Sequence, residues 1–374
     1  MTVSPQARTP EERGRTERRT VGATGRIERR TFLMQASAWS GGLCLGLAPN
    51  VSRAGQRSRI TKVERGPRGV TLTAELKEAP YPFGRAPYDD PTTLIFVPHH
   101  YVYGYRRAHP KTGAPESPPG LDLVVHFHGH KATARSSMET LQLREQLHES
   151  YQNAILVVPQ GPVKAADSRF GKLDSPGGFE RFLGDVRRAL QSPEASRALG
   201  KQARLPPEAR VGKVCISAHS GGYKAAARAA EFGQFPIQEI YLLDALYGEV
   251  SVFADWLEED PAPRGAASWR RRRKLVSLYR PGTVAKQNDS LRRQLDRRGI
   301  QYRVERSGEP LSRQALQEAA VLFVETRARH SKITCRNDLR DCLFASSLHR
   351  RPGLGDRWFK GEAKTRDIDA RDCR

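Results

Sequence analysis

The sequence predicts an α/β domain built on a mostly parallel central sheet, with helices on both faces and antiparallel strands at its N-terminal edge. Three observations lead to this fold class. Early in the chain, apolar and polar residues alternate with period two, which is typical of half-buried antiparallel strands. Further on, the apolar runs become continuous, as they are in strands covered on both faces. Between these runs, apolar residues recur three and four positions apart, which indicates helices.

The expected strands follow in chain order. Alternating residues predict strands at 60–66 and 69–76, and the run at 92–98 could be a third. Continuously apolar runs, expected to form the parallel part of the sheet, lie at 121–129, 153–161, 211–220, 237–248 and 273–282. A further alternating run lies at 300–308, and a final apolar strand lies within 315–325.

Helices are expected at 177–192, 223–233 and 283–299. The second of them is rich in alanine, the residue that favours helix most, and it ends in a glycine, as the third does. The basic run at 269–274 is interpreted as a solvated approach to the strand that follows. Stretches rich in proline and charge are expected to be surface loops, at 80–92, 109–120, 162–178 and 191–210.

The formal net charge of +22 is far from the usual balance of a soluble protein. It fits a nucleic-acid partner, an anionic surface or a basic proteome. Aromatic residues make up only 7% of the 374 residues, and no Cys/His finger spacing or basic heptad region appears. Nucleic-acid binding is therefore not expected, whereas the charge would favour contact with anionic polymers of the cell envelope.

The N-terminal segment resembles a twin-arginine export signal. Arg29 and Arg30 stand side by side, Phe32 and Leu33 follow, and a mildly apolar stretch without charge comes next. The resemblance implies the twin-arginine export machinery as a partner and a periplasmic or secreted protein. An uncleaved anchor and a chance arginine pair are the alternatives.

Cleavage could follow Ala54, because the stretch 51–54 has small residues at both key positions. Residues 1–54 are therefore expected to be the signal peptide and residues 55–374 one large domain, in which no internal repeat appears.

The five cysteines fit an exported protein loosely. Cys44 would leave with the signal, and Cys215, inside an expected strand, is interpreted as a buried small hydrophobe. Two of Cys335, Cys342 and Cys373 could pair in an oxidising compartment, although sequence alone does not give the connectivity.

The residues Ala218-His219-Ser220-Gly221-Gly222 stand where an expected strand gives way to an expected helix. Small residues two before and two after the serine suit a sharp turn in which neighbouring backbone comes very close. The stretch is similar to the G-x-S-x-G nucleophile elbow of the α/β-hydrolase family, with alanine in place of the first glycine. The resemblance spans most of the domain and implies an α/β-hydrolase fold with Ser220 as the nucleophile.

The same resemblance implies the other parts of the site. The sequence His128-Gly129-His130 at the end of a strand is similar to the family's oxyanion loop, so the backbone N–H groups of His130 and Gly221 are expected to form the oxyanion hole. His330 follows the last expected strand, where the family keeps its general base. His148 and His349 are interpreted as surface residues.

Asp244 and Asp289 are the two candidates for the acid that orients His330. Asp244 ends the strand that follows the elbow strand, so its carboxylate is expected at the same sheet edge as Ser220. The commoner family position is one strand later, where Asp289 is the first acid, but this residue lies inside an expected helix beside arginines. Asp244 is therefore chosen.

These residues predict a serine hydrolase that cleaves carboxyl esters without a cofactor or metal. A peptidase or amidase acting through the same triad is the nearest alternative, because the elbow does not separate esters from amides. His126, His128 and His130 would share one face of a strand and could bind a metal, with His99-His100 as an undirected supplement. A non-catalytic envelope-binding module is the third alternative.

Overall fold

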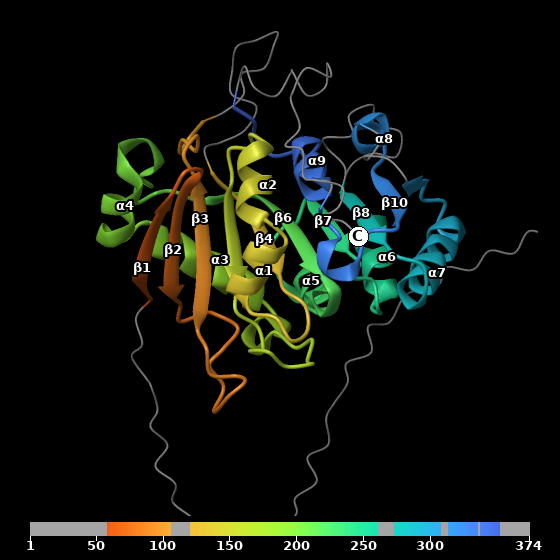
Figure 1. Cartoon of the computed structure of the whole chain (residues 1–374), viewed down its shortest axis with the longest axis horizontal. Coiled ribbons are helices and arrows are strands. Elements are labelled where there is room, and N and C mark those ends of the chain that lie inside the picture. The colour runs from red at the N-terminus through yellow and green to blue at the C-terminus, as the bar shows by residue number, and fades with distance from the viewer. Residues whose placement is uncertain (1–57, 106–119, 261–272, 308–312, 336, 352–374) are drawn as a thin grey trace, which may run out of the picture. The chain divides into compact units, whose positions relative to one another are not determined.

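The computed structural model describes residues 58–105, 120–260, 273–307, 313–335 and 337–351. In this part of the chain a ten-stranded sheet runs in the order β1-β2-β3-β5-β4-β6-β7-β8-β10-β9 (Figure 1). Its strands are β1 (Arg59–Gly66), β2 (Gly69–Glu75), β3 (Thr92–Pro98), β4 (Leu121–Phe127), β5 (Ile155–Pro159), β6 (Val211–His219), β7 (Glu239–Leu243), β8 (Lys274–Tyr279), β9 (Arg303–Ser307) and β10 (Val321–Thr326).

The pairing of the strands divides the sheet into two parts. The pairs β1–β2, β2–β3 and β3–β5 are antiparallel, whereas every pair from β5 through β4 to β9 is parallel. The antiparallel strands thus form the N-terminal edge, as the sequence predicts. The carboxyl ends of the parallel strands, and the loops that follow them, all lie along one side of the sheet, called here the carboxyl edge. The side along which these strands begin is called the amino edge.

Helices cover both faces of the sheet (Figure 1). On one face α3 (Gly178–Leu190), α4 (Pro193–Ala203), α5 (Tyr223–Phe232), α6 (Val250–Glu258) and α7 (Thr283–Arg297) enclose one apolar core. On the other face α1 (Ala134–Thr140), α2 (Leu143–Glu149), α8 (Arg313–Glu318) and α9 (Asp338–Phe344) enclose a second. The predicted architecture, a mostly parallel sheet with helices on both faces and antiparallel strands at its N-terminal edge, is confirmed.

Alternation along the strands explains why there are two cores. In β4, Leu123 and Val125 belong to the first core, while Val124 between them belongs to the second. Successive side chains of a strand point to opposite faces, so a strand covered on both faces needs apolar residues at nearly every position. The continuous apolar runs in the sequence have this cause.

The structure corrects two expectations about surface segments. The stretch 191–210 was expected to be a loop, but it contains α4, whose N-cap Ser192 accepts a hydrogen bond from the N–H of Ala195. This helix contributes few apolar residues to the core, so its periodicity in the sequence is weak. The basic run at 269–274 was expected to be solvated, but its last residue, Lys274, is buried and donates hydrogen bonds to the carbonyl groups of Leu316 and Ala345.

Several expected features fall wholly or partly outside the described residues: the signal peptide, Cys373, most of the loop 109–120, most of the basic run 269–274 and the last residue of the strand expected at 300–308. Among the described residues, Cys335 is disulfide-bonded, whereas Cys215 and Cys342 are free and buried. A Cys335–Cys342 pair, one of the pairings that the sequence allows, is therefore not formed.

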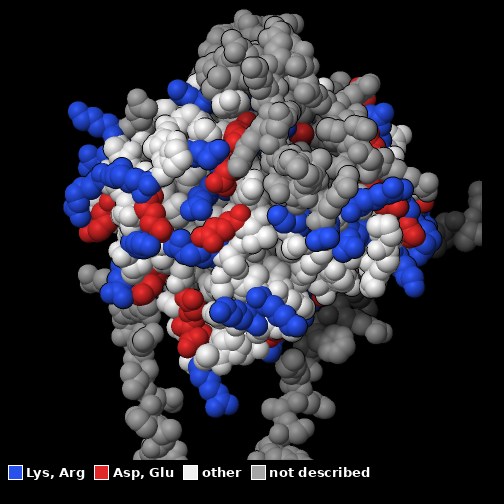
Figure 2. Space-filling view, in the orientation of Figure 1, with Lys and Arg blue, Asp and Glu red and all other residues white. Residues whose placement is uncertain are grey.

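Two further features of the described residues are the distribution of charge on the surface and the hydropathy of the helices. Basic side chains form several groups on the face shown in Figure 2, with acidic side chains among them, so the positive charge is not gathered into one field there. Among the described helices, none is both long and apolar enough to cross a membrane.

Candidate active site

Ser220 lies directly after β6, at the start of the short 3-10 helix η2 (Ser220–Gly222) that leads into α5. Its backbone has a φ of 52°, a left-handed conformation that a non-glycine residue rarely adopts. The strand behind the turn is buried and Ala218 is fully covered, so packing holds the turn in this conformation. Such a turn lifts the serine side chain above the carboxyl edge of the sheet.

The glycines around Ser220 are required by close backbone approach. A Cβ atom on Gly129 would lie 2.7 Å from the Cβ of Ser220, and one on Gly222 would collide with the carbonyl oxygen of Phe127. The ends of the neighbouring strands β4 and β6 therefore meet without room for side chains. This contact places the His128-Gly129-His130 loop against the elbow.

Asp244 and His330 come together at the same edge. His330 begins the short 3-10 helix η4 (His330–Lys332) after β10, and its Nδ1–H group donates a hydrogen bond of 2.6 Å to Oδ2 of Asp244. The other carboxylate oxygen accepts a hydrogen bond of 3.1 Å from the backbone N–H of Arg280. The Asp244 side chain is 4% exposed and that of His330 is 35% exposed, so the carboxylate is enclosed while the imidazole is partly open to solvent.

Asp289 does not take part in this arrangement. It lies on α7 and forms an ion pair with Arg292, the next turn of the same helix. The geometry therefore favours Asp244 over Asp289 as the partner of His330. The catalytic roles themselves stay predictions, and the hydrogen bonds of the described residues include none between the hydroxyl of Ser220 and His330.

His219, which the sequence left without a role, connects the elbow to the histidine loop. Its Nε2 atom lies 2.9 Å from the backbone oxygen of His330, and the two imidazole rings are 4.6 Å apart. Burial, and secondly the neighbouring His330, together lower the pKa of His219 to about 4. The residue next to Ser220 in the chain thus contacts the residue expected to be its base.

His130 contributes more to the site than the backbone N–H that the sequence suggested. Its Nε2 atom forms a hydrogen bond of 2.6 Å with Oγ of Ser168, and its ring occupies the space where a side chain at Gly221 would lie. The His128-Gly129-His130 loop and the residue after Ser220 are therefore packed together. Donation by the N–H groups of His130 and Gly221 to an oxyanion stays a prediction.

His128 holds the base of this loop in place. Its Nε2 atom accepts hydrogen bonds from the backbone N–H of Gly161 at 2.8 Å and from the amide of Gln160 at 3.0 Å. Its Nδ1–H group therefore donates to the carbonyl oxygen of Gly129, at 2.9 Å. Burial lowers the pKa of His128 to about 4, so the ring is neutral at physiological pH.

The three histidines of the HFHGH stretch have separate partners. The Nδ1 atom of His126 forms a hydrogen bond of 2.6 Å with Ser217, while His128 and His130 contact the groups named above. Burial holds the pKa of His126 well below its usual value. Within the described ranges, no three His, Cys, Asp or Glu side chains form a group suited to a metal ion, and His99 and His100 instead lie against the backbone oxygens of Gly66 and Gln152.

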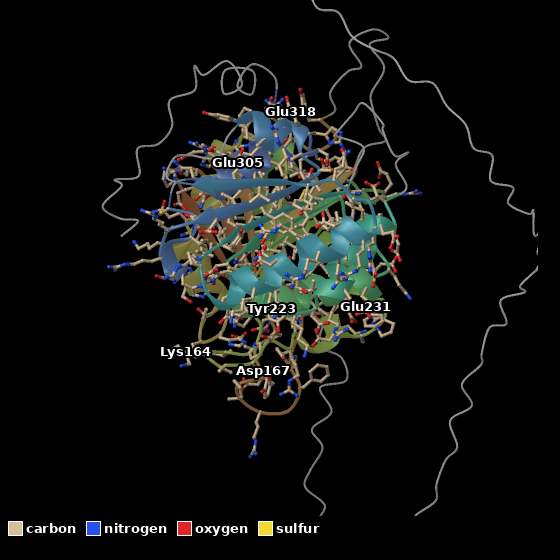
Figure 3. The ribbon with its side chains drawn as sticks, turned by 90° about the vertical axis from the view of Figure 1, so that its right-hand side faces the viewer. Lys164, Asp167, Tyr223, Glu231, Glu305 and Glu318 are labelled. Atoms are coloured by element: carbon tan, nitrogen blue, oxygen red, sulfur yellow. The ribbon has the colours of Figure 1, made fainter. Side chains whose placement is uncertain are left out.

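Two tyrosines that sequence reasoning missed lie beside the elbow and the acid. Tyr223 begins α5, and its ring is 6.2 Å from that of Tyr247, which is 38% exposed. Burial raises the pKa of Tyr247, and the charge of Asp244 adds to the rise. Figure 3 shows Tyr223 at the same end of the molecule as Lys164 and Asp167, with Glu318 near the opposite end.

His349 is not a surface residue, contrary to the expectation. It is 5% exposed, and its Nδ1 atom lies 2.5 Å from Oδ2 of Asp122, near the start of β4. An aspartate inside the apolar run at 121–129 was the available clue, because a buried carboxylate requires a partner. His148 is half-buried in α2, with its ring 5.2 Å from that of His100.

Comparisons with known proteins were made for the whole chain. No protein-family model matches it, and no curated protein does. A ferulic acid esterase structure is 13% identical, with 77% of this chain and 98% of that chain covered and a TM-score of 0.39. An S-formylglutathione hydrolase from Staphylococcus aureus is 11% identical, with 75% and 98% covered and a TM-score of 0.41. A mutant of the feruloyl esterase module from Clostridium thermocellum is 12% identical, with 77% and 93% covered and a TM-score of 0.41. With identities and TM-scores this low, the likenesses carry no argument about function, which rests on the side chains.

Proposed function

We propose that this protein is a serine hydrolase that cleaves carboxyl esters through an acyl-enzyme on Ser220. The observation that carries the proposal is the hydrogen bond between Asp244 and His330 at the carboxyl edge, where Ser220 stands in a left-handed turn. A serine hydroxyl is a poor nucleophile until a neighbouring imidazole takes its proton. An oriented imidazole and a raised serine at one edge are the parts that this chemistry needs.

The reaction has two steps that share one path. In the first, Oγ of Ser220 attacks the carbonyl carbon, its proton passes to Nε2 of His330, and the alcohol leaves with that proton. In the second, water attacks the acyl-enzyme by the same route and releases the acid. Asp244 keeps the Nδ1–H tautomer of His330 and stabilises the imidazolium, and the N–H groups of His130 and Gly221 would stabilise the oxyanion.

The central test is covalent labelling. A fluorophosphonate should label the protein on Ser220, and Ser220→Ala should abolish both labelling and the hydrolysis of a panel of acyl esters. Ser217→Ala is the matched control, because Ser217 lies three residues before Ser220, within β6, and contacts His126. Labelling that survives Ser220→Ala, or activity lost to a chelator and restored by zinc, would contradict the serine mechanism.

A peptidase or amidase function is the second candidate, because the same groups can cleave amides. Matched ester and anilide substrates with one acyl group separate the two. We expect the ester to be turned over faster than the anilide. The ratio of the two enzymatic rates should exceed the ratio of their uncatalysed hydrolysis rates in water. Turnover of the anilide alone would assign the amidase function.

We further infer that the protein is exported. The paired arginines Arg29-Arg30 before Phe32-Leu33 support this, and so does the disulfide of Cys335, since disulfides persist in oxidising compartments. Replacing both arginines by lysine should leave the precursor in the cytoplasm, with the cleavage after Ala54 blocked. Unchanged export of that variant would leave a general secretory signal or an anchor.

A further inference from the structure

The side chain of His219 occupies an unusual position relative to the groups of the proposed site. It precedes Ser220 in the chain, and it lies against the backbone of His330, which is 111 residues away in sequence. β6, which carries His219, and β10, which precedes His330, are separated in the sheet by β7 and β8. The loop after β10 therefore crosses the ends of two strands to reach the elbow.

The protonation state of His219 follows from its contacts. A carbonyl oxygen only accepts hydrogen bonds, so the Nε2 atom of His219 carries the proton that it donates to His330, at 2.9 Å. Burial disfavours the charged form of His219, and His330 beside it disfavours it further. His219 is therefore a neutral donor that leaves the positive charge of catalysis to His330.

Two contacts thus fix His330, one on its ring and one on its backbone. Asp244 accepts from the ring at 2.6 Å and sets its rotation, whereas His219 holds the carbonyl oxygen of the same residue. Asp244 and His219 stand at the carboxyl ends of the adjacent strands β7 and β6. Since η4 is only three residues long, its own helical hydrogen bonds contribute little to its position.

We propose that His219 is a positioning residue that fixes the distance between Ser220 and the imidazole of His330 by hydrogen bonding to the His330 backbone. This inference rests on the proposed function, because it assigns His219 a task in the same reaction. The turn at Ser220 does not itself require a histidine at position 219, since the elbow needs only small residues two positions to either side of the serine. The role proposed for His219 acts through His330 and requires no contact with substrate or with the transferred proton.

Two substitutions separate the donor from the bulk of the ring. His219→Met keeps much of the volume without a hydrogen-bond donor, whereas His219→Gln keeps an N–H donor at a similar reach. His219→Met should lower kcat about 10- to 100-fold with little change in KM, because a small displacement of the base slows the chemical step and leaves substrate binding intact. His219→Gln should recover most of the loss.

The chain offers a matched control in His100. This residue is also half-buried, its Nε2 atom lies 3.0 Å from the carbonyl oxygen of Gln152, and its ring is tilted against that of His148. His100→Met removes the same type of hydrogen bond at a place away from the site. It should change thermal stability about as much as His219→Met does, with kcat unchanged.

A measurement independent of turnover keeps the inference separate from the proposed function. In protein with ¹⁵N-labelled histidine, the Nδ1–H proton of His330 that is bound to Asp244 should give a far-downfield resonance, which Asp244→Asn identifies. In His219→Met this resonance should shift or broaden, while His219→Gln and His100→Met leave it in place. Wild-type protein that neither hydrolyses esters nor binds fluorophosphonate would refute the proposed function alone. An unchanged resonance, or an unchanged kcat, in His219→Met would refute the positioning role.

Discussion

One aspartate–histidine contact lies at the carboxyl ends of the parallel strands and another lies at their amino ends. The two contacts differ in how far solvent reaches the histidine. At the carboxyl edge, Asp244 and His330 are 2.6 Å apart and the histidine side chain is 35% exposed. At the amino edge, Asp122 and His349 are 2.5 Å apart and the histidine side chain is 4% exposed. The same pair of residue types thus occurs once within reach of solvent and once enclosed.

The surroundings explain the difference. Oδ1 of Asp122 accepts a hydrogen bond from the backbone N–H of Lys213, and Oδ2 accepts from both the ring and the backbone of His349. These bonds tie the C-terminal segment to the beginnings of β4 and β6. At the opposite edge, the pair stands beside a serine in a left-handed turn. An aspartate–histidine contact therefore becomes a candidate site through its position, and otherwise it is part of the core.

The largest expected effect comes from breaking the contact between Asp244 and His330. Asp244→Asn should lower kcat by about 10⁴-fold, because the amide no longer selects the reactive tautomer of His330 or stabilises its charged form. Its thermal unfolding midpoint should stay close to that of the wild type. Loss of folding in this variant would instead assign Asp244 a structural role, and a larger loss of activity in Asp289→Asn would move the acid to α7.

Breaking the contact between Asp122 and His349 should instead lower stability and leave activity unchanged. Asp122→Asn should lower the free energy of unfolding by about 3 kcal/mol, because the donors of His349 and Lys213 then face a group with only one acceptor. The folded fraction should keep its kcat. Urea denaturation with parallel ester assays checks both, and a stable variant with reduced kcat would mean that the two edges are coupled.

Acid should weaken the fold through three histidines, of which His128 is buried and His148 and His219 are half-buried. The pKa values of His128, His148 and His219 are lowered to about 4 from an ordinary 6.5, mainly by burial. The unfolded chain therefore binds more protons than the folded chain between these values, so their stabilising effect is complete above pH 6.5 and is lost as the pH falls toward 4. For His128 the loss is at most about 1.4 kcal/mol per pH unit.

Urea midpoints measured at a series of pH values test this. They should be level near pH 7 to 8 and fall steadily below about pH 6.5. His99→Gln, at an exposed histidine, should leave the curve unchanged. A midpoint that stays constant down to pH 4.5 would contradict the neutral state of these rings.

The smallest expected effect concerns two glycines, one at each edge. A Cβ atom on Gly221 would collide with the ring of His130, and one on Gly212 would collide with Oδ1 of Asp122. Gly221→Ala should lower kcat/KM about tenfold, and His130→Ala in the same protein should reduce that effect, because the two positions share one space. Gly212→Ala should lower stability and leave kcat/KM unchanged. Independent effects of Gly221→Ala and His130→Ala would contradict the packing of the oxyanion loop on the elbow.

Much of the fold follows from local patterns. The strands at 60–66 and 69–76 lie where alternation predicts them, the run at 92–98 that could be a third strand is one, and the alanine-rich helix begins at Tyr223 as expected. The helices α1, α2, α6, α8 and α9 were not predicted, because most of them are shorter than three turns and carry polar residues that tertiary contacts bury. In α9, for example, Asp338, Arg340 and Asp341 are all buried.

The sequence by itself determined the elbow, because its small residues and the change from strand to helix are properties of consecutive positions. It also placed Asp244, His330 and His130 at strand ends that meet at one edge. Only the tertiary structure decided which histidine faces which aspartate: His330 and Asp244 are 86 residues apart, and His349 and Asp122 are 227 apart. The strand order β6-β7-β8-β10 brings the first pair together, and the return of the C-terminal segment to the amino edge brings the second. Such contacts are set by which strands lie side by side, a relation that no local pattern of residues records.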